Sequence, residues 1–96
     1  VHNLTKEEIC RIAEYMLRSL SSKLRDMDID MTFEKSALEA IADAGFDDVY
    51  GARPLRRAIQ SNLEDAISEK ILEGIITAHK SYVCKYEDGR YEFVEA

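Results

Sequence analysis

The chain has 96 residues, 46% of them apolar and 33% charged, and its 13 basic and 19 acidic side chains give a formal charge of −6. This composition is typical of a folded globular protein, and the length suffices for one domain with a modest core. The acidic balance argues against binding to nucleic acid or to an anionic membrane, and no apolar run approaches the roughly 20 residues that span a bilayer.

The start of the sequence, its cysteines and its histidines bear on the compartment and on metal binding. The sequence starts at Val1 and shows no signal-peptide pattern, so we expect a fragment of a cytoplasmic protein. Cys10 and Cys84 do not form a disulfide framework and are expected to be free thiols. Neither these cysteines nor the separate His2 and His79 have partners at metal-binding spacing, so we expect no metal site.

The first element that the sequence predicts is a long amphipathic helix over residues 4–27. Thr5 and Glu8 have the spacing of a capping box, in which each side chain bonds a free amide at the helix start. Apolar residues then recur at steps of three and four, and they are Ile9, Ile12, Ala13, Met16, Leu17, Leu20 and Leu24. One face of this helix should therefore be buried.

A short strand and a second helix are predicted next. Residues 27–33 alternate between apolar and polar, which places Met27, Ile29, Met31 and Phe33 on the buried side of a strand. A helix should follow over residues 34–45 and end at Gly45, which we expect at the C′ position in a left-handed conformation.

A third helix and a hairpin complete the prediction. The helix should run from Pro54 to about Glu73 and stop at Gly74. Asp88-Gly89 is typical of a two-residue type I′ turn. Because a lone hairpin is marginally stable in water, we expect a three-stranded sheet packed with three helices, an α+β fold that forms a single domain over residues 1–96.

The chemistry-bearing stretch is "YGARPLRRAIQ", residues 50–60, where Arg53, Arg56 and Arg57 crowd the start of the third helix. A helix start already carries the positive end of the dipole, so the cluster implies an acidic partner. That partner is either a carboxylate of the chain (Asp47, Asp48 or Glu64), a phosphate ligand, or an acidic surface of another protein. Arg53, directly before the proline, is best placed to project from the loop.

The same region carries a family resemblance. "GFDDVYGARPLRRAIQSNLEDAISEKILEG" resembles the sensor-2 segment of the Clp-type AAA+ unfoldases, the ClpA, ClpB and ClpC proteins. The opening "LTKEEICRIAEYML" and the stretch "ALEAIADAGFD" resemble the same small C-terminal domain of their second ATPase module. The similarity covers essentially the whole chain in one order.

The resemblance implies a role for three residues. Arg53 matches the sensor-2 arginine, which reaches the γ-phosphate of ATP held by the large domain of the same subunit. Ala52 and Ile12 match positions near the adenine. No catalytic residue is expected in this chain, because it lacks a phosphate loop and an apolar strand that ends in paired acids.

The resemblance also implies cofactors and partners. The parent would bind ATP or ADP with Mg, and the isolated domain would bind neither. Its partners would be the large ATPase domain, neighbouring subunits of a hexameric ring on whose large domains it packs, unfolded or aggregated proteins, and in some members a peptidase. "IITAHK", residues 75–80, departs from the Pro-Gly often found there in the family, and the subfamily stays undecided.

Two other classes of function compete with this interpretation. One is a free-standing acidic interaction domain whose arginines only form internal ion pairs. The other is a nucleic-acid-binding lid, against which the net charge and the missing basic stripe argue.

Overall fold

A computed structural model of the chain describes residues 4–47 and 49–96. Its first helix, α1 (Lys6–Arg25), begins as the sequence predicts. The Thr5 hydroxyl accepts from the Glu8 amide at 3.2 Å, and the Glu8 carboxylate accepts from the Thr5 amide at 2.9 Å. Ile9, Ala13, Leu17, Leu20 and Leu24 are buried along one face, while Ile12 and Met16 are half-buried beside them.

The first strand, β1 (Ile29–Phe33), is shorter than predicted. Met27 lies in the turn before it and is exposed, so its predicted place on the buried side of the strand is wrong. Asp28 has a φ of 61°, and this left-handed residue ends the extended pattern on which the prediction depended.

The second helix, α2 (Lys35–Ala44), ends at Gly45, but not for the predicted reason. Gly45 has a φ of −98°, which any residue can adopt. A Cβ atom at this position would lie 2.5 Å from Cδ1 and 2.7 Å from Cα of Leu55. Glycine is therefore required because the end of α2 and the start of the third helix approach closely, not because the backbone turns left-handed.

The predicted third helix is a continuous run of three segments, α3 (Leu55–Ile59), the π-helical η1 (Gln60–Glu64) and α4 (Asp65–Leu72). Its buried side chains are spaced by four, and they are Leu55, Ile59, Leu63 and Ile67. In an α-helix each step of four would turn the side chain by about 40° away from the core. The wider π turn reduces this drift and keeps the four residues on one buried face.

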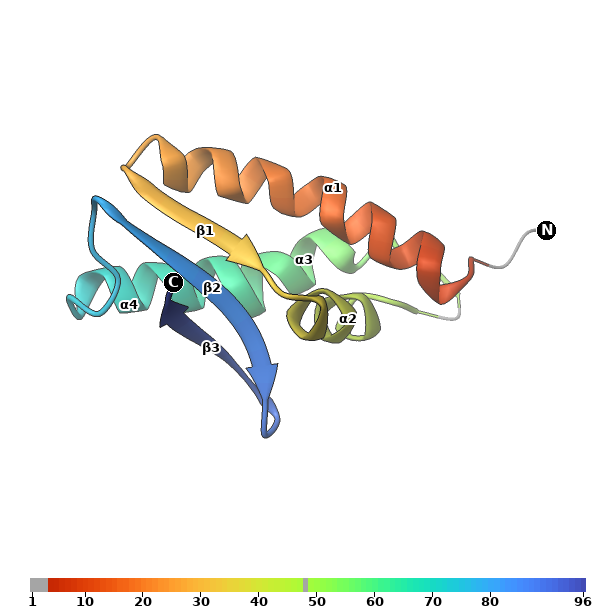
Figure 1. The fold of residues 1–96 in the computed structure, drawn as a ribbon. Coiled ribbons are helices and arrows are strands. Elements are labelled where there is room, and N and C mark those ends of the chain that lie inside the picture. The colour runs from red at the N-terminus through yellow and green to blue at the C-terminus, as the bar shows by residue number, and fades with distance from the viewer. Residues whose placement is uncertain (1–3, 48) are drawn as a thin grey trace.

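The sheet has the order β1-β2-β3, with β1 parallel to β2 (Lys80–Glu87) and β2 antiparallel to β3 (Arg90–Glu95). The hairpin register pairs Glu87 with Arg90 and Tyr86 with Tyr91, which confirms the predicted two-residue turn. Figure 1 shows α1 along one long side of the molecule, α3 to α4 along the other, and the sheet across them. The structure confirms the α+β class: residues 4–47 and 49–96 form three helical runs and a three-stranded mixed sheet around one apolar core.

The two thiols lie within this fold as free cysteines. Cys84 is fully buried on β2, and burial raises the pKa of its thiol to about 12. Burial, with a smaller contribution from Glu39, also raises the pKa of the Cys10 thiol. Both side chains are therefore protonated near neutral pH. In the described part of the chain, no helix is long and apolar enough to cross a bilayer, and no cluster of three or more His, Cys, Asp or Glu side chains could hold a metal ion.

Candidate functional site

The site is built on a tight loop, residues 46–54, which we call the arginine loop. One carboxylate oxygen of Asp47 accepts from the backbone amides of Val49 at 2.7 Å and of Tyr50 at 2.9 Å. The backbones of Asp47 and Gly51 exchange two hydrogen bonds, of 2.9 and 2.7 Å. The hydrogen bonds that the Asp47 carboxylate accepts from the Tyr50 amide and, to a smaller extent, from the Val49 amide hold the pKa of this carboxyl below its usual value.

Gly51 lets the chain turn back toward the helix. Its φ of 64° lies in the left-handed region, where a side chain is disfavoured, whereas the space around it is open apart from Leu4. The Arg53 amide then donates to the Tyr50 carbonyl at 3.2 Å, and the Leu55 amide donates to the Ala52 carbonyl at 3.0 Å. Leu55 is fully buried, so the loop is anchored to the core one residue after Pro54.

Arg53 is exposed on this loop. Its guanidinium carbon lies 5.7 Å from the centre of the Tyr50 ring, within the range of a cation–π contact. Tyr50 itself is 60% exposed. The loop therefore holds a positive charge directly before a helix, and no ion pair to a carboxylate within residues 4–47 and 49–96 neutralises it.

The carboxylates that the sequence offered as internal partners are largely engaged elsewhere. Asp47 caps backbone amides, and Glu64 lies 3.9 Å from the Lys23 ammonium. Asp48 lies outside the described residues. None of the ion pairs formed within residues 4–47 and 49–96 involves Arg53, Arg56 or Arg57. Within that part of the chain, the arginine cluster has no carboxylate partner.

The other two candidate residues, Ile12 and Ala52, are half-buried and pack against the edge of the same core, one from α1 and one from the arginine loop. Their aliphatic side chains can offer only apolar contact.

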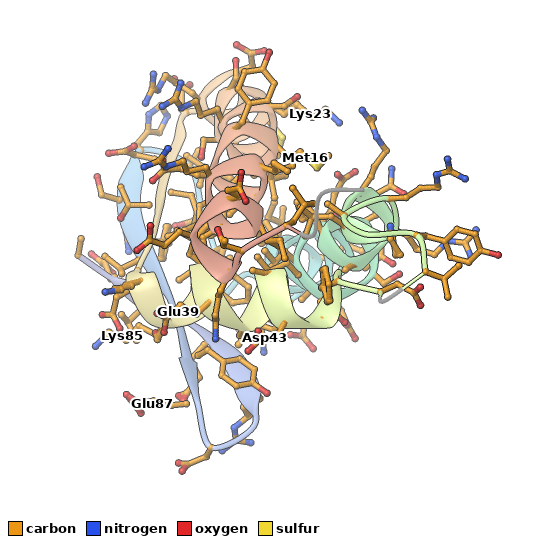
Figure 2. All side chains as sticks on the ribbon, turned by 90° about the vertical axis from the view of Figure 1, so that its right-hand side faces the viewer. Met16, Lys23, Glu39, Asp43, Lys85 and Glu87 are labelled. Carbon is orange, nitrogen blue, oxygen red and sulfur yellow. The ribbon has the colours of Figure 1, made fainter. Side chains whose placement is uncertain are left out.

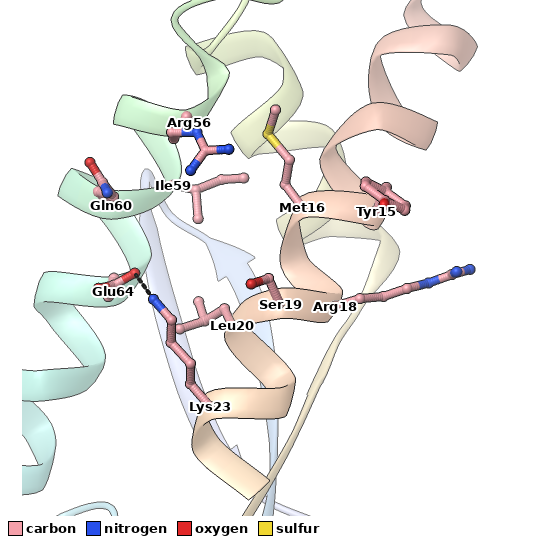
Figure 3. A pocket seen from close by; sticks show the side chains of 10 residues that line it. All are labelled: Tyr15, Met16, Arg18, Ser19, Leu20, Lys23, Arg56, Ile59, Gln60 and Glu64. Atoms are coloured by element: carbon pink, nitrogen blue, oxygen red, sulfur yellow. Dashed lines mark ion pairs between the residues drawn. The ribbon is translucent and has the colours of Figure 1, made fainter. Parts of the chain in front are cut away.

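A second feature, which sequence reasoning missed, is a groove between α1 and the α3–η1 segments, with a volume of about 510 Å³. Figure 3 shows Met16 and Ile59 facing each other across it, Arg56 at one end and the Lys23–Glu64 ion pair at the other. The only sign of this groove in the sequence is the placement of Arg56 three residues after Arg53. The groove itself depends on how α1 packs against the α3–η1 segments.

Together these features define a small α+β domain that presents, before a helix, an arginine without an ion pair to any described carboxylate, and an amphipathic groove nearby. A family model described as the C-terminal, D2-small domain of ClpB protein matches residues 4–84. The chain belongs to this family.

Curated relatives support the assignment. A stretch of 75 residues, 78% of the chain, is 45% identical to the chaperone protein ClpB of Oceanobacillus iheyensis and covers 9% of that protein. The negative regulator of genetic competence ClpC/MecB of Bacillus subtilis is 38% identical over 90 residues, 94% of this chain and 11% of the relative. The chloroplastic chaperone protein ClpC2 of Oryza sativa is 49% identical over 71 residues, 74% of this chain and 8% of the relative. The chain thus spans only a small part of each relative's length.

Proposed function

We propose that residues 1–96 form, as a single domain, the lid of the second ATPase module of a Clp-type AAA+ unfoldase, and that Arg53 senses the nucleotide. In this proposal Arg53 reaches the γ-phosphate of ATP that is bound with Mg by the large domain of the same chain. The observation that carries the proposal is the exposed Arg53 guanidinium on a hydrogen-bonded loop, without an ion pair to any described carboxylate.

The chemistry of a guanidinium suits this role. It stays charged at all physiological pH values, and its planar set of donors fits phosphate oxygens in a bidentate way. Where negative charge develops during phosphoryl transfer, a positioned arginine stabilises it. Ala52 and Ile12 would then contribute apolar contact near the adenine, and the phosphate loop and catalytic acids would come from the large domain.

The remainder of the proposal concerns the parent protein. It would be a cytoplasmic hexamer that hydrolyses ATP to unfold or disaggregate proteins, with a peptidase as a further partner in protease-coupled members. The lid would move with the nucleotide state, because a sensor that contacts the γ-phosphate loses that contact after hydrolysis. The isolated domain would bind no nucleotide and catalyse no reaction.

The test is ATP turnover by the full-length protein with Arg53→Ala, and with Arg57→Ala as the matched control. We expect Arg53→Ala to lower the turnover number on the order of 100-fold while sedimentation still shows the assembled ring. Arg57→Ala removes the same charge four residues later and should leave turnover nearly unchanged. Unchanged turnover and ATP affinity in Arg53→Ala would contradict the sensor role.

A further inference from the structure

A pocket of about 400 Å³ lies where α2, the η1 and α4 segments and the β2–β3 hairpin meet, and we call it the hairpin pocket. Its volume is within the range of small-molecule sites. Three alanines line its helical side, Ala40 and Ala44 from α2 and Ala66 from α4. Figure 2 shows the hairpin extending past α2, with Glu87 near the hairpin's end. The pocket therefore forms only when three parts of the chain pack together.

The hairpin side of the pocket is aromatic. Tyr86 of β2 and Tyr91 of β3 both line it and are half-buried. Their ring centroids lie 4.8 Å apart, and the rings meet edge to face at 63°. The short alanine side chains opposite leave open the space that larger residues would fill. A flat apolar group placed there would contact methyl groups on one side and aromatic rings on the other.

The polar groups of the pocket have no partner within the described part of the chain. Neither the half-buried Asn62 carboxamide nor the hydroxyls of Tyr86 and Tyr91 take part in a hydrogen bond with any described residue. Burial is the main cause that raises the pKa of Tyr91 to about 12, so its hydroxyl stays protonated near neutral pH and can donate. Half-buried donors of this kind gain most from a ligand that accepts hydrogen bonds.

The charge of the pocket favours an anion. Among its described lining residues, Arg90 alone carries a charge. Arg90 lies opposite Glu87 in the hairpin register but forms no ion pair with any described carboxylate. Asp43, whose charge contributes to the raised pKa of Tyr91, lies 3.3 Å from the Lys6 ammonium, which offsets it. A single guanidinium beside hydrogen-bond donors complements a monoanion.

We propose that the hairpin pocket binds a small-molecule carboxylate with a flat apolar body, such as an aromatic carboxylic acid. The carboxylate pairs with Arg90, with the Asn62 amide and the tyrosine hydroxyls as further hydrogen-bond partners, and the apolar body packs against the alanine methyl groups. This site is separate from the proposed nucleotide sensor, because none of its residues belongs to the arginine loop.

The first test uses phenylacetate as the probe and phenylacetamide, which has the same shape without the charge, as its control. Each is titrated into the full-length protein with ¹³C-labelled alanine methyl groups, and methyl NMR spectra are recorded. Phenylacetate should shift the signals of Ala40, Ala44 and Ala66 with a Kd on the order of 1 mM, while the signal of the buried Ala13 on α1 stays in place. Phenylacetamide should bind at least about tenfold more weakly. Equal affinity for the two compounds, or no shift up to about 10 mM phenylacetate, would overturn the proposal.

The second test changes the pocket itself. Arg90→Gln should weaken phenylacetate binding about tenfold, because it removes the charge from an exposed position. Arg57→Gln makes the same change at an exposed position outside the pocket and should leave the Kd within about twofold. An equal loss in both variants would contradict the site.

A steric pair of variants tests the same site without changing its charge. Ala44→Leu fills the pocket from the exposed end of α2 and should abolish the shift of the Ala66 methyl signal. Ala78→Leu, also at an exposed position but outside the pocket, should preserve it. Unchanged Ala13 signals show in each case that the fold is intact. Phenylacetate binding that survives Ala44→Leu would overturn the proposal, whereas the outcome of the Arg53→Ala turnover test leaves it untouched, so the two proposals fail separately.

Discussion

Two tight turns of this molecule each contain a left-handed glycine but are held in different ways. The hairpin turn at Asp88-Gly89 has positive φ at both residues, 51° and 78°, and an added Cβ at Gly89 would meet no atom within 4 Å. The arginine loop also uses a left-handed glycine, Gly51, but a side-chain carboxylate and the buried Leu55 fix its shape. The hairpin turn depends on local sequence, whereas the loop depends on the core.

This difference suits the proposed roles of the two regions. A turn that only connects two strands needs no exact position relative to the rest of the protein. A loop that aims a guanidinium at a ligand must be held to within a fraction of an ångström, and contacts with rigid elements provide this precision. Changes at the base of the arginine loop should therefore affect both stability and ATP turnover, and changes in the hairpin turn should affect stability but not turnover.

The largest expected effect comes from Gly45→Ala. The new methyl group would meet the Cα atom of Leu55, which belongs to the backbone and cannot move without shifting the start of α3. We expect a loss of about 1–3 kcal/mol in the free energy of unfolding, as for other overpacked cores. Urea unfolding followed by circular dichroism measures it. A loss below about 0.5 kcal/mol would mean that the α2–α3 contact is looser than the structure indicates.

A matched pair of substitutions separates the two turns directly. Gly51→Ala and Gly89→Ala each force an alanine into a left-handed conformation, at a cost of about 1–2 kcal/mol. Gly51→Ala should also lower ATP turnover by the full-length protein, because Arg53 follows two residues later. Gly89→Ala should leave turnover unchanged. Equal effects of the two variants on turnover would show that the arginine loop does not position a functional group.

The sequence predicted the elements whose signals are local. The capping box of Thr5 and Glu8 and the hairpin register around Asp88-Gly89 are both confirmed, because each depends on residues within a few positions of one another. The fold class followed from these elements and from the need of lone strands for partners.

The errors have different origins. Gly45 is required by Leu55, ten positions away, whereas Met27 fitted the alternation of β1 but lies in the turn that the left-handed Asp28 makes. The sequence does contain a sign of the π segment, because the regular four-residue spacing of apolar residues from Leu55 to Ile67 is longer than the α-helical period of 3.6 residues.

The two parts of the candidate site, Arg53 and the groove, also differ in whether the sequence could predict them. Arg53 could be singled out from its place before Pro54 and from the resemblance of the surrounding motif, although its role stays a prediction. The groove could not be predicted, because it forms only when α1 packs beside the α3–η1 segments and leaves Arg56 and Met16 at one shared surface. A helix–helix groove depends on interaxial distance and side-chain size at the contact, which periodicity does not encode.

The smallest expected effect concerns acid and the Asp47 carboxylate. Because two amides hold the folded pKa of Asp47 below the ordinary value of 3.8, ionised Asp47 stabilises the fold above that value, and this stability is lost as the pH falls through the folded pKa. Asp47→Asn keeps an oxygen acceptor but not the charge, so it should be less stable than the wild type near neutral pH, with the gap closing in acid. Asp47→Ala removes the acceptor at every pH, so its gap should persist. Unfolding free energies from about pH 6 to about pH 2.5 measure both curves. A gap for Asp47→Asn that stays constant over this range would show that the two amide bonds do not depend on the charge of the carboxylate.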